Sequence, residues 1–144
     1  MITRIRDWWR TRQFIKLGNA EVDRFNAELS ECRQAIVSIA DDSIANLNGE
    51  LESLKARDDF GLDLCRETWR DWHDEGEEIV EASRDAVHQR LYDYLEFARV
   101  LEIEAEMQSI IDKAIDECKA YFLLGGADAY AKFATSNGLV PDED

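Results

Sequence analysis

The sequence has few residues that interrupt helices. Its single proline, Pro141, lies among the last four residues, and only seven glycines occur in 144 residues. Long stretches therefore run without a breaker, and no alternation of apolar and polar residues indicates strands. The sequence predicts an all-α fold, an elongated helical hairpin or bundle with coiled-coil-like seams and a short C-terminal helix.

Residues that catalyse reactions or bind metals are also scarce. His73 and His88 are the only histidines, too few for an HExxH zinc motif or for a catalytic triad with a choice of bases. Cys32, Cys65 and Cys118 include no CxxC pair. We therefore expect buried thiols in a reducing compartment rather than disulfides or a zinc site. The sequence predicts a protein without enzymatic activity, cofactor or metal.

Basic residues are too few to balance the acidic ones. The 17 lysines and arginines face 32 aspartates and glutamates, which gives a net charge of −15. A field of this sign repels nucleic acid and anionic lipid. We therefore expect no direct binding of nucleic acid and instead a protein partner with a basic surface, such as a nucleic-acid-binding complex. The sequence has neither a long apolar run nor a signal-peptide pattern, which predicts a cytoplasmic protein.

The first 16 residues differ from the rest in charge. Five basic residues and one acidic residue give this segment a net charge of +4, so the other 128 residues carry −19. Its apolar residues fall at helical spacing, which favours a short basic amphipathic helix. We predict that it docks on an acidic bundle, its own or a partner's; contact with a membrane interface is the alternative. The residues proposed for docking are Trp8, Trp9, Arg10 and Arg12.

These patterns divide the chain into three predicted segments. Residues 1–18 form the basic amphipathic N-terminal segment, which a break at Gly18 and Asn19 separates from the rest. Residues 19–138 form a single helical domain, and residues 139–144 form an acidic tail.

A heptad seam opens the helical domain. Its apolar residues step by 3, 4, 3 and 4 positions, which is the spacing of a coiled coil. The seam continues to Leu54, either unbroken or with a break at Asp41–Ser43 or at Gly49. Because the seams are longer than a monomer of this size can cover, we predict a homodimer. The residues expected to self-associate are Val22, Phe25, Leu29, Cys32 and Ile36.

The middle of the chain contains one clear turn. Residues 57–61 are predicted to form it, and a helix is expected to restart just after Gly61. Gly76 is expected either to kink that helix or to end it. From Glu77 the apolar spacing predicts a helical stretch of about 45 residues.

Two glycines mark the last predicted interruption. Gly125 and Gly126 are expected to end the long helix, and residues 127–136 to form the short C-terminal helix. Residues 137–139 then have the order expected for a Schellman-type stop, with a glycine followed by a hydrophobic residue.

The most unusual feature is an acidic run without basic residues. Six carboxylates occur from Asp71 to Glu81; on a helix this is roughly one per 2.7 Å, comparable with the ~3.4 Å phosphate spacing of one DNA strand. Members three and four positions apart form one stripe, and like charges at this spacing destabilise a helix. The stripe predicts a partner-binding surface that imitates a nucleic-acid backbone; a solvated face is the alternative. The stripe contains Asp71, Asp74, Glu78, Glu81 and Asp85. The residues predicted to bind the partner are Asp71, Asp74, Glu75, Glu78, Glu81 and Asp85.

In size, charge and helicity the chain resembles the acidic inhibitors that bacteriophages deploy against restriction and CRISPR systems. This compositional resemblance implies an inhibitor that blocks a basic nucleic-acid-binding site on its partner. A helical scaffold or adaptor, or a coiled-coil assembly protein, is the alternative. Arg66 and His73 resemble the Arg and His motif of helical HEPN-type ribonucleases, which implies a small helical enzyme as a third reading.

Overall fold

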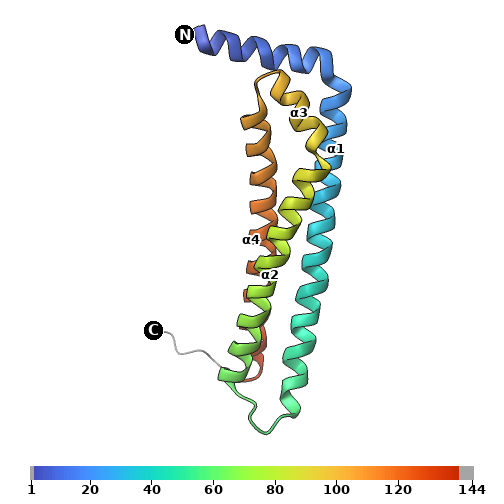
Figure 1. Cartoon of the computed structure of the whole chain (residues 1–144). Helices are drawn as coiled ribbons and strands as arrows, with labels where there is room; N and C mark the ends of the chain where they lie inside the picture. Colours follow the sequence, from blue (N-terminus) through green and yellow to red (C-terminus); the bar gives the residue numbers. More distant parts are fainter. Residues whose placement is uncertain (1, 140–144) are drawn as a thin grey trace. The chain divides into compact units, whose positions relative to one another are not determined.

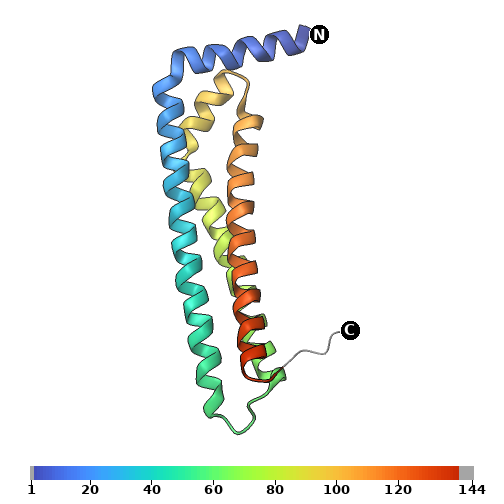
Figure 2. The same ribbon diagram turned by 180° about the vertical axis from the view of Figure 1, so that it is seen from behind.

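The fold is entirely helical over the part of the chain that the structure describes. The computed structural model describes the backbone of residues 2–139 and the side chains of residues 20–139. The all-α prediction is confirmed for these residues. The elements are α1 (Ile2–Ser53), the 3-10 helix η1 (Leu54–Ala56), α2 (Leu62–Arg90), α3 (Tyr92–Val100) and α4 (Glu104–Ser136), drawn in Figure 1 and, from behind, in Figure 2.

Two predictions fall outside the described residues. The residues proposed for docking lie before residue 20, where side chains are not described. The predicted acidic tail lies outside the described residues from residue 140 onward. Both stay predictions. The N-terminal residues concerned are Trp8, Trp9, Arg10 and Arg12.

The helices group into two compact units. Unit 1 contains Met1–Gln34 and Ser83–Asp116, and unit 2 contains Ala35–Ala82 and Glu117–Asp144. Each unit combines segments of α1, α2 and α4 that are far apart in the sequence, and unit 1 also contains α3. Each unit is described below by itself.

Helix α1 is continuous where the sequence suggested interruptions. The predicted break at Gly18 and Asn19 is wrong, and neither Asp41–Ser43 nor Gly49 breaks the helix. An unfavourable residue inside a helix destabilises it by about 1 kcal/mol or less. Each further helical residue adds a hydrogen bond, so a long helix extends through such positions.

The turn at residues 57–61 and the helix that restarts after Gly61 are confirmed, and α2 passes through Gly76 without ending. The helix of about 45 residues predicted from Glu77 is wrong, because the chain breaks after α2 and again after α3. The apolar spacing continues across the first break, since Leu91 is fully buried. Periodicity therefore located the buried side chains but not the break in the backbone.

Helix α3 ends in a Schellman motif that lacks glycine. Ile103 N–H donates to the carbonyl oxygen of Ala98 at 2.8 Å, and Glu102 N–H donates to that of Arg99 at 3.0 Å. Glu102 has φ 61°, in the left-handed region that glycine normally occupies. Without a glycine at this position, the sequence carried no signal for the stop.

Helix α4 is also continuous, so the predicted break at Gly125 and Gly126 and the separate short helix at residues 127–136 are wrong. Close packing explains both glycines instead. A Cβ at Gly125 would lie 2.5 Å from Cδ1 of Ile44, and a Cβ at Gly126 would overlap the indole ring of Trp72.

The Schellman-type stop after α4 is confirmed. Leu139 N–H donates to the carbonyl oxygen of Ala134 at 2.7 Å, and Gly138 N–H donates to that of Thr135 at 3.2 Å. Gly138 has φ 73°, which a residue with a side chain rarely adopts.

Candidate partner-binding surfaces

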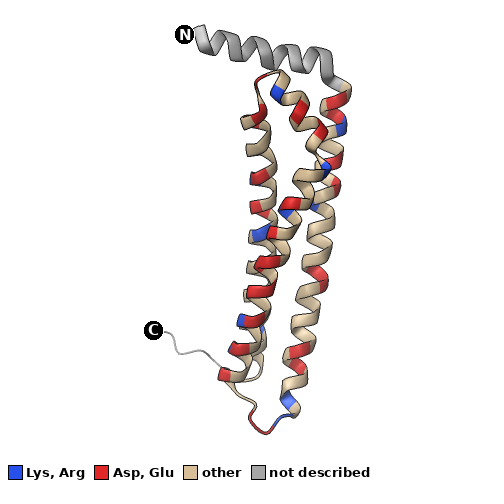
Figure 3. Ribbon diagram, in the orientation of Figure 1, with Lys and Arg blue, Asp and Glu red and all other residues tan. Residues whose placement is uncertain are grey.

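Helix α2 has a buried face and an acidic face within unit 2. Trp72, Gly76 and Val80 are buried, and at 100° per residue they lie on one side of the helix. The opposite side carries carboxylates that are all exposed, and acidic residues recur along this part of α2 (Figure 3). We define the α2 acidic face as Asp71, Asp74, Glu75 and Glu78.

Trp72 fixes the orientation of this helix. Its Nε1–H donates to the carbonyl oxygen of Ser43 on α1 at 2.9 Å, and its ring centroid lies 5.3 Å from that of Phe122 on α4. Gly126 leaves room for the indole, and Gly76 leaves room for the ring of Phe122. The indole is thus held by both neighbouring helices, and the carboxylates on the far side of α2 are kept away from the core.

The described residues provide little neutralisation of the α2 acidic face. Among the described residues, Asp71, Glu75 and Glu78 have no ion-pair partner. His73 lies near two carboxylates, with Nδ1 3.5 Å from Oδ1 of Asp74 and 3.4 Å from Oε1 of Glu77. At these distances a protonated imidazole offsets the surrounding charge only in part.

The two remaining members of the predicted stripe, Glu81 and Asp85, are not part of the α2 acidic face. Glu81 lies in unit 2 and pairs with Lys119 of α4 at 3.4 Å, so α4 partly neutralises it. Asp85 is exposed but belongs to unit 1. The structure therefore brings four of the predicted residues together on one exposed face, three of them without an ion-pair partner among the described residues, and sets these two apart.

The predicted self-association seam is buried within the chain itself. Phe25, Leu29, Cys32 and Ile36 have exposed fractions of 3–6%, while Val22 is half-buried. In unit 1 the ring of Phe25 packs edge-on against Tyr94 of α3, with centroids 5.7 Å apart. The seam thus finds cover inside one chain, and self-association through it stays a prediction.

All three cysteines, Cys32, Cys65 and Cys118, are buried, as predicted. Burial raises the pKa of the Cys32 and Cys65 thiols above the ordinary value. A raised pKa disfavours the thiolate, which is the nucleophilic and metal-binding form. The cysteines therefore act as small hydrophobic residues of the core.

Unit 1 contains a polar cluster that the sequence did not reveal. Asp112 of α4 accepts a hydrogen bond from His88 Nε2 at 2.9 Å and one from Arg84 at 3.2 Å. Arg84 also donates to Asp116 at 2.6 Å. The hydrogen bond from His88 and then that from Arg84 lower the pKa of Asp112, against the effect of desolvation. In the sequence, the only signal for this cluster was that Arg84 and His88 on α2, and Asp112 and Asp116 on α4, are each four residues apart.

The residues that resemble the ribonuclease motif lie on one helix. Arg66 and His73 are both half-buried and stand about two turns apart on α2. The His73 ring lies 5.6 Å from that of Trp69, which stacks on Tyr130 of α4 at 5.3 Å. Among the described side chains, no three His, Cys, Asp or Glu residues form a group that could hold a metal ion.

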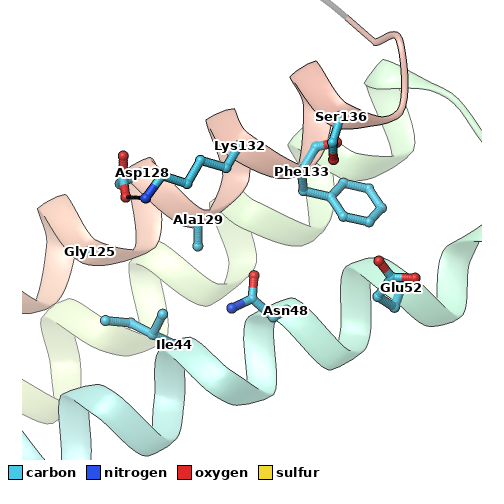
Figure 4. A pocket seen from close by; sticks show the side chains of 9 residues that line it. All are labelled: Ile44, Asn48, Glu52, Gly125, Asp128, Ala129, Lys132, Phe133 and Ser136. Carbon is cyan, nitrogen blue, oxygen red and sulfur yellow. Dashed lines mark hydrogen bonds and ion pairs between the residues drawn. The ribbon is translucent and has the colours of Figure 1, made fainter.

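A groove of about 500 Å³ lies between α1 and α4 in unit 2 (Figure 4). Its apolar residues include Ile44, Ala129 and Phe133, and Asp128 and Lys132 form an ion pair at 2.9 Å on its α4 side. The full set of lining residues is Ile44, Asn48, Glu52, Gly125, Asp128, Ala129, Lys132, Phe133 and Ser136.

The chain matches no protein-family model, no curated protein and no solved structure. Within the part of the chain that the structure describes, no helix is both long and apolar enough to cross a membrane. The functional reasoning therefore rests on the geometry and charge of the described surfaces.

Proposed function

We propose that the chain is a non-enzymatic interaction protein whose α2 acidic face binds a basic surface of a protein partner. In its most concrete form, the partner is a nucleic-acid-binding enzyme of a restriction or CRISPR system, and the chain blocks its nucleic-acid site. One observation supports this most: four exposed carboxylates share one face of α2, and among the described residues three of them, Asp71, Glu75 and Glu78, have no ion-pair partner.

The energetics of the face support a bound partner. Like charges three and four positions apart destabilise a helix by roughly 0.2–0.5 kcal/mol per pair. The pairs Asp71–Asp74, Asp71–Glu75 and Asp74–Glu78 all have this spacing. A cationic groove on a partner would relieve this repulsion, and the charge would also accelerate association. The buried Trp72 contacts hold the α2 backbone that carries the carboxylates in place before binding, so binding does not have to order this helix.

The alternative function is a helical scaffold or adaptor whose acidity only maintains solubility. A scaffold of this kind would associate through apolar surfaces, and its binding would change little with salt. Binding through exposed carboxylates weakens as salt rises, because charges are screened over about 8 Å at physiological ionic strength. Salt dependence therefore separates the two functions.

A displacement assay tests the proposal. Fluorescently labelled duplex DNA is bound to a panel of purified restriction enzymes and guide-loaded CRISPR effectors, and the full-length chain is titrated in. We expect the chain to release DNA from at least one of these enzymes, with a midpoint that rises steeply with salt. Release from none of them would contradict the inhibitor function.

Two matched triple variants locate the binding surface. The face variant carries Asp71→Asn, Asp74→Asn and Glu78→Gln. The control variant carries Asp42→Asn, Glu50→Gln and Asp58→Asn, which removes the same number of charges from exposed positions elsewhere in unit 2. We expect the face variant to lose about tenfold or more in displacement potency, since three exposed contacts contribute up to about 1 kcal/mol each. Equal losses in both variants would mean that total charge, rather than the α2 acidic face, determines binding.

A further inference from the structure

Charge is sparse along the C-terminal part of α4. From Ala120 to Leu139 the only charged residues are Asp128 and Lys132, which pair with each other at 2.9 Å. The entire net charge of −15 therefore lies elsewhere in the chain. Tyr121 and Leu124 are nevertheless 47% and 68% exposed on this helix. The hydroxyl of Tyr121 donates to Oδ1 of Asp41 on α1 at 2.6 Å, which leaves Leu124 as the exposed apolar side chain beside the groove. An exposed leucine of this kind is typical of an interface.

The groove lies next to these two side chains. Gly125 lines it, and the side chain of Ile44 on α1 fills the space that a Cβ of this residue would take. Asp128 and Lys132 follow along the same side of α4 in Figure 4. An exposed leucine thus stands immediately beside a position without a side chain.

The order of residues along this surface is self-complementary. Six residues fall within an arc of roughly 100° on α4, and their steps of four, three, one, three and four are the same in both directions. We define them as the α4 face: Glu117, Tyr121, Leu124, Gly125, Asp128 and Lys132. All six belong to unit 2.

An antiparallel pair of such faces matches residue by residue. With a two-fold axis between Leu124 and Gly125, each Leu124 lies over the partner's Gly125 and the Ile44 side chain that covers it. Glu117 then meets the partner's Lys132, and Tyr121, whose hydroxyl donates to Asp41 of its own chain at 2.6 Å, lies beside the partner's Asp128. This arrangement is isologous, as a two-fold interface requires, and within the α4 face it pairs no like charges.

We propose that two copies of the chain associate through the α4 face in this antiparallel register. The charge distribution favours a second copy as the occupant. Two chains that each carry −15 repel over most of their surface, so they can approach closely only where charge is absent or complementary. The interface uses none of the α2 acidic face, and it replaces the N-terminal seam, whose side chains are already buried.

Sedimentation velocity of the full-length chain over a range of concentrations tests this association. We expect a reversible dimer that tightens as salt rises, because salt screens the repulsion between two acidic chains. Leu124→Asp should weaken the dimer by at least about a hundredfold, since it brings two negative charges together near the axis. Its melting temperature should change little, because Leu124 is 68% exposed. Val100→Asp, at an even more exposed position of unit 1, should leave the dimer intact.

A charge exchange tests the register itself. Glu117→Lys alone and Lys132→Glu alone each place like charges opposite each other and should weaken the dimer. The double variant with both changes restores opposite charges across the axis and should recover most of the affinity. A monomer under all conditions would overturn the proposal, as would a dimer that tolerates Leu124→Asp. Failure of the double variant to recover, with melting temperature unchanged, would overturn the register.

Discussion

The two units differ in the contacts that their acidic side chains make. In unit 1, arginine and histidine side chains reach across to carboxylates of other helices: Arg90 pairs with Glu31 at 2.5 Å, and Asp112 accepts bonds from Arg84 and His88. In unit 2, aromatic rings and glycines make close contacts between helices, and Glu81 pairs with Lys119. Among the described residues, three carboxylates of the α2 acidic face, Asp71, Glu75 and Glu78, have no ion-pair partner. Carboxylates thus link helices in unit 1, while those of the α2 acidic face are exposed on the surface of unit 2.

The largest expected change in stability comes from adding one methyl group to Gly126 in unit 2. In Gly126→Ala the new Cβ would overlap the ring of Trp72, which its hydrogen bond to Ser43 holds in place. We expect the free energy of unfolding to fall by about 2–3 kcal/mol, as for an overpacked core. Chemical denaturation with circular dichroism measures it.

The matched control is Gly49→Ala, also within a helix, where a Cβ would meet nothing within 4 Å. This change should stabilise the protein by about 0.5–1 kcal/mol, because alanine favours helix more than glycine does. If both alanine variants behaved alike, tight packing around Trp72 would not be what stabilises unit 2.

A smaller, pH-dependent effect is expected in unit 1. The pKa of Asp112 is lowered in the folded chain by His88 and Arg84. A carboxylate with a lowered pKa stabilises the fold at neutral pH, and this stabilisation disappears as pH falls through the lowered value. Asp112→Asn should therefore reduce the free energy of unfolding by about 1 kcal/mol at neutral pH, a value that allows for the exposure of Asp112.

The reduction should shrink as pH falls through the lowered pKa of Asp112, because the wild-type carboxyl group is then protonated as well. Asp23→Asn, at an exposed position of unit 1 with no ion pair among the described residues, is the control and should change stability little at either pH. A loss from Asp112→Asn that did not depend on pH would show that the carboxylate charge is not responsible.

The smallest effect concerns the end of α3. Glu102 adopts a left-handed conformation that a side chain disfavours. Glu102→Gly should raise the free energy of unfolding by about 0.5–1 kcal/mol, since glycine is the preferred residue at this position of a Schellman motif. Glu106→Gly, within the first turn of α4, should lower it by a similar amount. Thermal melts of the two variants measure both changes.

These contrasts explain what the sequence could reveal. Apolar spacing identified most of the buried residues, because a residue's face on a helix depends only on its position. It could not locate the end of α3, because the left-handed residue there is a glutamate. The sequence also predicted a break at Gly125 and Gly126, which is wrong. A glycine that lets a neighbouring helix pack closely cannot be told apart, from sequence alone, from a glycine that ends a helix.

The candidate site was also predictable only as far as spacing along one helix allowed. The acidic stripe follows from spacing alone, so Asp71, Asp74, Glu75 and Glu78 were identified correctly as one exposed group. The pairing of Glu81 with Lys119 depends on how α4 packs against α2, 38 residues apart in the chain, and no local pattern encodes it. The polar cluster around Asp112 escaped notice for the same reason.

The most direct test of the binding role of the α2 acidic face is the salt dependence of affinity for an enzyme from which the chain displaces DNA. The dissociation constants of the wild type, the face variant and the control variant are measured by titration calorimetry across a series of salt concentrations. We expect the wild type and the control variant to share one steep slope of log Kd against log salt, and the face variant to have a clearly shallower slope with weaker binding at low salt. Equal slopes and affinities for the wild type and the face variant would contradict the proposed role and leave these carboxylates as a solvated surface.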